Sequence, residues 1–430
     1  MMPSRHLVSL SVLVVAAGLA AIAAPGAASA GPGATRYASP SGKGTACSSA
    51  HPCSIVTAIN HAGRGQEVIV GPGTYGSQQH QIPTALSAEA PGLSIHGAVN
   101  KERPIIHLAA KIGLETAKSV ALSNVQIDSS GSTSGLFALG TVSHVIVLSN
   151  GDGASACAVY DSIVDSLCVA RGEDSTALAM TRGSEVPPTK HLNVTIRGVT
   201  AVATDPHGIG LLAAAGEFTA ITVTATNDIF QGGLQDVESS TNASTATATV
   251  NLKHSDYHHS TASDAGGGEA AVNGNATDVS KPTRFAAPDQ SNFREAPSSP
   301  TIDKGATDPA HDTDLVGRPR RVGSAPDIGA YEFLQRPAIT HLKKRGVSAD
   351  SATVSADVYA EGLRAQVRVV ATHGHTVRES PWVTARNKLV ARHVRLTVHG
   401  LAGHKKYAVR MVARNPGGTT SSAPISVTTR

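Results

Sequence analysis

The chain has 430 residues, a formal net charge of only +4 and an aromatic content of 3%. Such a small net charge argues against a nucleic-acid partner, which requires a concentrated positive face. The shortage of large side chains excludes a conventional aromatic-rich core and favours many thin layers of small β-branched residues. The length predicts two or three domains.

The N-terminus has the pattern of a secretory signal peptide. Arg5 precedes an apolar run over residues 7–24, a Pro-Gly break follows, and residues 28–30 (Ala-Ser-Ala) suit cleavage. The alternative is an uncleaved membrane anchor, against which the Pro-Gly break and the small residues argue. We expect residues 1–30 to be removed, leaving a chain that is secreted, extracellular or associated with the cell wall, and that has no further membrane span.

Four cysteines are expected to form disulfides in an oxidising compartment. Three connectivities are possible. The spacing favours Cys47 with Cys53 and Cys157 with Cys168, because each pair closes a short loop. Each bond is expected to stabilise the fold by about 2 to 3 kcal/mol. A metal site or a reactive thiol is the alternative, but the chain contains no Cys-x-x-Cys motif.

Between Glu67 and Tyr257, short strands with alternating apolar residues recur about every 22 to 30 residues, a repeat typical of solenoids. A β-sandwich would need tight hairpins, but Asn-Gly and Asp-Gly dipeptides seldom lie between these strands. The pattern therefore predicts a coil of stacked parallel strands. Asn124, Asn193 and Asn227 are expected at its corners or in its side-chain ladders.

Three segments near the N-terminus resemble the start of secreted right-handed β-helix proteins of the pectate-lyase-like superfamily. They are residues 37–42 (YASPSG), 53–59 (CSIVTAI) and 68–75 (VIVGPGTY). The resemblance implies an extended arm and a short amphipathic helix that cap the first turn of a parallel β-helix. The residues agree, since Val56 and Ile59 lie on one helical face and would cover an open sheet end.

A second resemblance lies at about residues 298–333. The segments 299–305 (SPTIDKG), 314–320 (DLVGRPR) and 327–332 (DIGAYE) resemble the choice-of-anchor Q domain, which closes β-helices of exported bacterial proteins. Its acidic residues and arginines are expected to pair as a cap. The acidic stretch from Asp308 to Asp314 is a candidate Ca²⁺ site, although it lacks the Gly and the terminal Glu of an EF-hand. No other metal ligands are assigned.

Residues 336–430 resemble a fibronectin type III domain in their strand spacing and in three segments, 351–356, 401–410 and 413–418. Tyr407 corresponds to the tyrosine corner of that family, with its hydroxyl bonded to nearby backbone. Trp382 departs from the family pattern, because it lies in the middle of the domain. The predicted fold is therefore all-β, with a right-handed parallel β-helix over residues 31–335 followed by a fibronectin type III-like β-sandwich.

Glycoside hydrolysis requires two carboxyl groups about 5 to 9.5 Å apart. Asp161 with Asp165, and Asp236 with Glu238, are close in sequence, but the signatures of the polygalacturonase-like family are absent. The simpler interpretation is that these carboxylates lie on solvated corners.

The densest group of titratable residues is the segment 253–259 (KHSDYHH). A polysaccharide lyase needs a cation to neutralise a uronate carboxylate and a base to remove the neighbouring proton. The candidate catalytic residues are therefore Lys253, His254, Asp256 and His258. A continuing strand would place the last three on one face, where they could also hold a metal, whereas a corner would separate them. The turn at residues 205–208 (DPHG), with a single His, is a lesser candidate.

Binding without catalysis is the predicted function. A parallel face of Thr, Ser, Asn and Asp offers hydroxyls and amides at regular spacing to an extended polysaccharide or cell-wall glycan, and the scarcity of aromatics predicts modest affinity. The basic C-terminal domain is expected to be attracted to an anionic wall. The alternative is a diverged polysaccharide lyase or glycoside hydrolase. We expect a monomer with no nucleic-acid partner.

Overall fold

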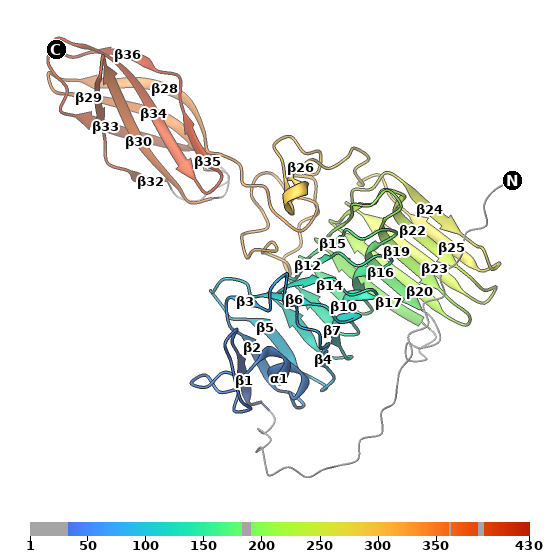
Figure 1. The fold of residues 1–430 in the computed structure, drawn as a ribbon. Coiled ribbons are helices and arrows are strands. Elements are labelled where there is room, and N and C mark those ends of the chain that lie inside the picture. Colours follow the sequence, from blue (N-terminus) through green and yellow to red (C-terminus); the bar gives the residue numbers. More distant parts are fainter. Residues whose placement is uncertain (1–32, 183–190, 361–362, 386–390) are drawn as a thin grey trace. The chain divides into compact units, whose positions relative to one another are not determined.

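The structure is a computed structural model that describes residues 33–182, 191–360, 363–385 and 391–430 (Figure 1). The predicted signal peptide, residues 1–30, lies outside the described residues. The chain divides into two compact units, the first ending at Pro282 and the second running from Thr283 to Arg430. Among the described helices, none has the length and apolar character that crossing a membrane requires.

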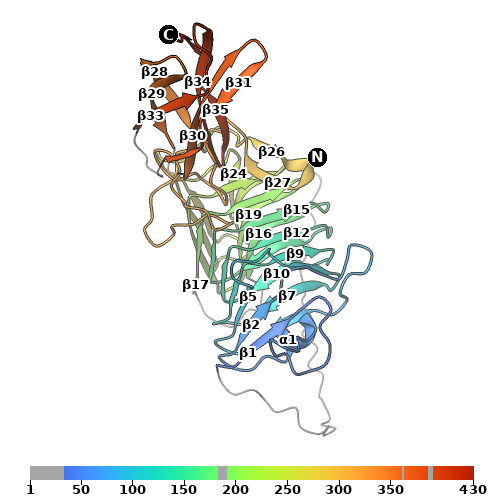
Figure 2. The same cartoon turned by 90° about the vertical axis from the view of Figure 1, so that its left-hand side faces the viewer.

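The first unit is a right-handed parallel β-helix, as predicted, and its described strands form three parallel sheets (Figures 1 and 2). Successive turns of the coil add one strand to each sheet. Sheet A contains β1 (Thr35–Ala38), β2 (Glu67–Val70), β5 (Ser94–Gly97), β8 (Ala121–Ser123), β11 (Thr141–Ser143), β14 (Ser162–Val164), β17 (His191–Arg197), β20 (Ala220–Thr226), β23 (Thr247–Lys253) and β25 (Glu269–Asn273).

The other two sheets complete each turn. Sheet B contains β3 (Thr74–Tyr75), β6 (Ile105–Leu108), β9 (Gln126–Ser129), β12 (Ile146–Ser149), β15 (Leu167–Ala170), β18 (Thr200–Ala203) and β21 (Ile229–Gln231). Sheet C contains β4 (Leu86–Ala88), β7 (Ile112–Thr116), β10 (Ser134–Ala138), β13 (Ser155–Val159), β16 (Thr176–Arg182), β19 (Ile209–Ala215), β22 (Gln235–Thr241) and β24 (Ser260–Ser263).

The interior of the coil consists of small and medium apolar side chains stacked in register. Strands in neighbouring turns lie about 4.8 Å apart, so each inward side chain contacts its equivalent above and below. Burial of these stacked side chains stabilises the coil in place of the aromatic core that the composition excludes. One row in sheet A, buried throughout, consists of Val68, Ile95, Leu122, Val142, Ile163, Ile196, Ala225 and Leu252.

The corner from sheet A to sheet B also repeats in register. The residue after the sheet A strand adopts a left-handed conformation, which Asn, Asp and Gly tolerate best. Its N–H donates to the carbonyl that ends the next sheet A strand, as in Asp165 to Arg197 at 2.8 Å and Asn227 to Lys253 at 3.2 Å. This corner row consists of Asn124, His144, Asp165, Gly198, Asn227 and His254. Two of the three predicted asparagines therefore lie at corners, and Asn193 lies on strand β17.

The first turn is covered by helix α1 (Ile55–Asn60), whose N-cap Ser54 accepts a hydrogen bond from the Thr57 N–H. Ile55, Ala58 and Ile59 are buried against the coil, whereas Val56, which the sequence placed on the covering face with Ile59, is only partly buried against it.

Both predicted disulfides are present. Cys47 is bonded to Cys53 beside this cap, and Cys157 of β13 is bonded to Cys168 of β15 inside the coil.

The second unit begins with irregular chain around the hairpin of β26 (Phe285–Ala287), the short helix η1 (Pro288–Gln290) and β27 (Asn292–Glu295), and it continues into an antiparallel β-sandwich. The first sheet of the sandwich contains β28 (Ala338–Val347), β29 (Ser351–Tyr359) and β33 (Arg392–His399). The second contains β30 (Ala365–His373), β31 (Thr376–Glu379), β32 (Val383–Ala385), β34 (Lys406–Asn415), β35 (Gly418–Ser421) and β36 (Ile425–Thr428).

The sandwich has its own core and a basic surface. Tyr407 is buried, and its hydroxyl accepts a hydrogen bond from the Ala402 N–H at 2.9 Å, the contact expected of a tyrosine corner. Trp382 is half-buried between the guanidinium groups of Arg368 and Arg414, at 4.5 and 4.2 Å from the ring centroid.

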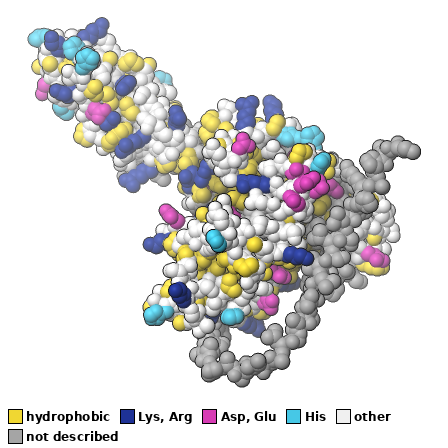
Figure 3. Space-filling view, in the orientation of Figure 1, with side chains coloured by type: hydrophobic (Ala, Val, Ile, Leu, Met, Phe, Trp, Pro, Cys, Tyr) yellow, Lys and Arg dark blue, Asp and Glu magenta, His cyan; other side chains and the backbone are white. Residues whose placement is uncertain are grey.

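Residues 336–430 contain 16 Lys and Arg against four Asp and Glu, and dark blue side chains are spread over the sandwich (Figure 3).

The acidic residues in the range 298–333 accept hydrogen bonds from the main chain. Asp303, Asp314, Asp327 and Glu332 each accept at least two hydrogen bonds from backbone N–H groups. Of the two arginines in the motif, Arg320 is buried and its charge acts on Glu332. A segment with little regular secondary structure must satisfy its buried N–H groups with side chains, and carboxylates do so here.

Candidate functional site

A broad exposed face of the β-helix lies where the strands of sheet A lengthen. β8, β11 and β14 have three residues each, whereas β17, β20 and β23 have seven. Buried and more exposed residues alternate along the three long strands, so every second side chain points outward. We call this outward surface the platform; it consists of His191, Asn193, Thr195, Arg197, Ala220, Thr222, Thr224, Thr226, Thr247, Thr249, Asn251 and Lys253.

The platform is a grid of hydroxyl and amide groups. Neighbouring strands place equivalent side chains about 4.8 Å apart, and outward residues of one strand are about 6.6 Å apart. The imidazole Nε2 of His191 lies 3.0 Å from Asn193 Oδ1 and 3.3 Å from Thr222 Oγ1. Asn251 Oδ1 accepts a hydrogen bond from Asn273 Nδ2 of β25 at 3.0 Å. These contacts fix the orientation of polar groups that face solvent.

One row of the platform is basic. Arg197, Thr226 and Lys253 pair in register at the ends of the three long strands. Two strand spacings, about 9.6 Å, therefore separate the backbone positions of the two cations. Lys253 is exposed and Arg197 is half-buried. Two like charges on one edge attract anionic groups to that edge.

The four predicted catalytic residues are divided by a corner. Lys253 ends β23 and points outward, whereas His254 is a corner residue with φ of 48°, its N–H bonded to Thr277 Oγ1 at 3.1 Å. Asp256 follows the corner, is 2% exposed and bridges to sheet B. Its Oδ1 lies 3.4 Å from His258 Nε2. The structure thus brings Asp256 and His258 together and places Lys253 at the end of sheet A strand β23, on the other side of the corner from them.

Three of the four residues in the two predicted carboxylate pairs occupy corners or support them, and Glu238 lies within β22. Asp161 and Asp165 flank opposite ends of β14, and Asp165 is buried at its corner. Asp236 is 2% exposed and accepts hydrogen bonds from three backbone N–H groups, those of Gly232, His258 and His259, at 2.7 to 2.9 Å. A carboxylate that accepts three such bonds stabilises the loop that supplies them.

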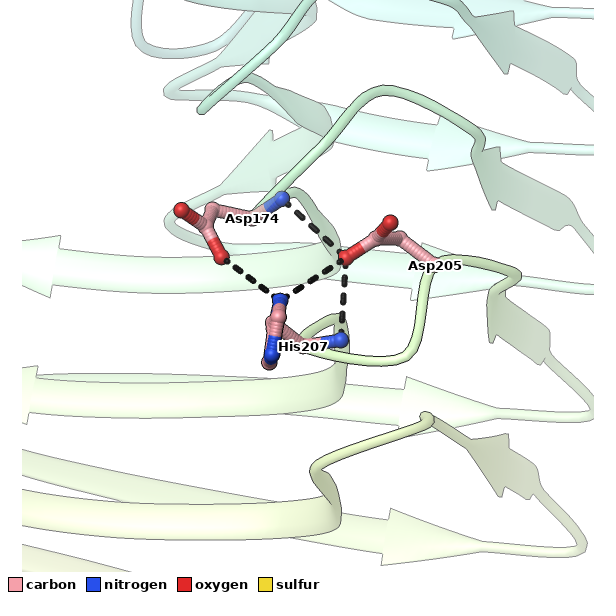
Figure 4. A group of neighbouring side chains, drawn as sticks. All are labelled: Asp174, Asp205 and His207. Carbon is pink, nitrogen blue, oxygen red and sulfur yellow. Dashed lines mark hydrogen bonds and ion pairs between the residues drawn. The ribbon is translucent and has the colours of Figure 1, made fainter.

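Asp174, Asp205 and His207 form the one group in the described part of the chain whose three metal-ligand atoms lie within 4.8 Å of one another (Figure 4). The Nδ1 of His207 lies 3.5 Å from Asp174 Oδ1 and 3.8 Å from Asp205 Oδ1. Asp205 Oδ1 also accepts the N–H groups of Asp174 and His207 at 3.3 and 2.9 Å. Asp174 and His207 are exposed, so the cluster is an open acidic corner with a titratable imidazole.

Sequence reasoning considered residues 205–208 but missed Asp174, which precedes Asp205 by 31 residues. Both lie in the connection from sheet B to sheet C, in successive turns of the coil. The signal that identifies Asp174 is its position in the coil: because Ala170 pairs with Ala203 and Thr176 pairs with Ile209, Asp174 is the equivalent of His207 one turn earlier. Aligning the turns on their strands would therefore have found the pair.

In the predicted Ca²⁺ stretch, carboxylate oxygens accept hydrogen bonds from the backbone, and the ion site stays a prediction. Asp308 Oδ1 accepts the Ala310 N–H at 2.9 Å, and both oxygens of Asp314 accept backbone N–H groups. These carboxylates hold the loop closed through Asx-type turns.

No family model and no curated protein matches this chain. Among solved structures, the pectate lyase Pel9A is 14% identical with a TM-score of 0.39, and the match covers 70% of this chain and 97% of that one. A myokine structure is 19% identical with a TM-score of 0.18, covering 21% of this chain and 95% of that one. The sensor domain of the anti-sigma factor RsgI4 in Pseudobacteroides cellulosolvens is 15% identical with a TM-score of 0.18, covering 22% and 96%. Similarities at these identities and TM-scores support no argument about the function of this chain.

Proposed function

We propose that this protein is exported and binds an extended, carboxylate-bearing polysaccharide on the platform of its β-helix. The observation that carries the proposal is the in-register grid of Thr and Asn side chains bordered by the row of Arg197, Thr226 and Lys253. A linear glycan presents hydroxyl groups along its length and, where it contains uronates, carboxylates at intervals. The grid offers matching donors and acceptors, and the two cations offer partners for the carboxylates.

Many weak contacts would supply the affinity. A single hydrogen bond contributes about 1 kcal/mol in water, so one sugar is bound weakly. A polymer that spans three or more strands gains from multivalency, because each further contact is intramolecular. The basic row adds attraction that salt screens over about 8 to 10 Å.

Export and attachment belong to the same proposal. Two disulfides suit an oxidising compartment, and residues 1–30 have the pattern of a signal peptide. We assign residues 298–333 to a closing module of the choice-of-anchor Q type and residues 336–430 to a fibronectin type III-like domain. The basic surface of this domain would add attraction to an anionic wall polymer.

Arg197 and Lys253 on one row also favour a second candidate, a polysaccharide lyase. Lysine can act as the base that removes the proton next to a uronate carboxylate, and an arginine can neutralise that carboxylate. Residue Lys253 and its neighbour His254 would then act on a sugar bound at the basic edge of the platform. Activity would appear as absorbance of unsaturated products, and a Lys253→Ala/His254→Ala variant would lose it.

Calorimetric titration with polygalacturonate, alginate and a neutral glucan tests the proposal. Binding to the two uronates is expected, and it should weaken as salt rises. Lys253→Gln should weaken uronate binding and reduce its salt dependence, because one cation leaves the basic row.

Thr224→Val removes a central hydroxyl while keeping the side-chain shape, and it should weaken binding to every polymer that binds. The matched control is Thr141→Val, an exposed threonine of sheet A on the narrow strand β11. Absence of binding to all three polymers, or equal affinity of the Thr224 and Thr141 variants, would contradict the proposal.

A further inference from the structure

The corner that leads from sheet C into sheet A contains a repeated tight turn. In the turns at residues 90–93, 117–120 and 216–219, the N–H of the fourth residue donates to the carbonyl of the first, at 3.3, 3.3 and 3.2 Å. The third residue of each turn has a positive φ, a position that Gly and Asn occupy most readily. These third residues are Gly92 (φ 72°), Ser119 (φ 66°) and Phe218 (φ 57°).

Phe218 does not suit this position. A bulky side chain in the left-handed region has an unfavourable contact with its own backbone, which Gly92 avoids. The ring of Phe218 does not offset this cost by burial, because the residue is 68% exposed. Its backbone is nevertheless held in place, since its N–H donates to Thr245 Oγ1 of the neighbouring turn at 3.0 Å. Strain that the fold maintains without a gain in packing points to a function for the side chain.

The location of Phe218 connects it to the platform. It lies two residues before Ala220, the first residue of β20, which is the central long strand. Ala220 pairs in register with His191 of β17 and Thr247 of β23. Two residues of extended chain span about 7 Å at most, so Phe218 stands at the edge of the platform opposite the basic row.

We infer that Phe218 stacks on one sugar ring of the polysaccharide bound to the platform, an inference that rests on the proposed function. The face of an aromatic ring is apolar with a negative quadrupole, and it packs on the C–H face of a pyranose while the hydroxyl groups of the sugar remain available to the grid. In a chain with 3% aromatic residues, an exposed ring beside a polar grid defines the subsite at which orientation of the glycan is fixed. Burial of the ring also contributes affinity that the polar contacts lack.

Replacing Phe218 by glycine separates this role from a role in stability. Phe218→Gly is expected to raise the melting temperature, because glycine removes the left-handed strain. The same variant is expected to bind the uronate polymer about tenfold more weakly, the loss that corresponds to exposing part of an aromatic ring. Phe218→Trp should bind at least as tightly as the natural protein. Val99→Ala is the matched control, since Val99 is 71% exposed in the loop between β5 and β6, away from the platform.

Three results would overturn the inference, and they differ in what they imply for the proposed function. If the natural protein binds the polymer and Phe218→Gly binds it equally well, the stacking role is wrong and the platform remains the binding site. If the natural protein binds no polymer in the titrations, the proposed function fails and the stacking role fails with it. A fall in the melting temperature of Phe218→Gly would show that the ring stabilises the fold, which also contradicts the inference.

Discussion

Glu295, the last residue of β27, is predicted to make the stability of the neighbouring residues 298–333 depend on pH. Its carboxyl group is 6% exposed, accepts a hydrogen bond from Thr301 Oγ1 and lies beside Asp327. Burial first, and then the charge of Asp327, raise the pKa of Glu295 to about 9. The same two causes raise the pKa of Glu332 to about 10. Both groups therefore carry a proton in the folded protein at neutral pH and release it on unfolding.

The sign and size of the effect follow from this proton release. Between about pH 4.5, where the unfolded carboxyls titrate, and about pH 9, each group lowers the free energy of unfolding by about 1.4 kcal/mol per pH unit. Asp327 adds to this trend, because burial raises its pKa to about 6 as well, so residues 298–333 are most stable in acid and lose stability as pH rises. Glu295→Gln imitates the protonated form, since its amide can donate to Asp327 and its oxygen can accept from Thr301. The variant should lose less stability per pH unit than the natural protein, and at pH 8 its free energy of unfolding should be higher by on the order of 4 kcal/mol.

Hydrogen exchange measured by mass spectrometry on peptides covering residues 320–333 gives the opening free energy of the segment at each pH. The values are compared from pH 5 to 9 after correction for the intrinsic pH dependence of exchange. Asp312→Asn is the control, because Asp312 is an exposed carboxylate in the same segment. An equal slope in the natural protein and Glu295→Gln, or an opening free energy that rises with pH, would refute the reasoning.

Three further predictions concern the β-helix. Replacing Cys157 and Cys168 together by alanine should lower the free energy of unfolding by about 3 kcal/mol in urea titrations, because the bond closes an 11-residue separation; an unchanged midpoint would mean that the bond does not constrain the unfolded chain. Asn124→Val should cost about 1 to 2 kcal/mol and Asn124→Gly much less, since φ is 53° there; equal melting temperatures would contradict the corner argument. Asp236→Ala should cost about 3 kcal/mol by leaving three backbone N–H groups without their acceptor, and circular dichroism melts would show whether Asp236→Asn recovers part of the loss.

The sequence by itself determined the architecture of the coil and its disulfides. A parallel β-helix is defined by a short-range pattern, because most strands of sheet A alternate buried and more exposed residues and each pairs with the equivalent strand one turn later. The row from Val68 to Leu252 in sheet A is visible as that pattern in the sequence. The pairing of Cys157 with Cys168 followed for the same reason, since one turn of a coil keeps residues 11 apart in sequence close in space.

Only the tertiary structure decided which side chains meet around the coil and how wide its faces are. The length of β17, β20 and β23, and with it the platform, depends on where each corner falls, and a shift of one residue reverses which side chains face solvent. Asp174 meets His207 because two connections stack, and the corner at His254 separates Lys253 from Asp256. The register of the hydrogen bonds between turns depends on the length of every turn in the coil, so no local pattern of residues specifies it.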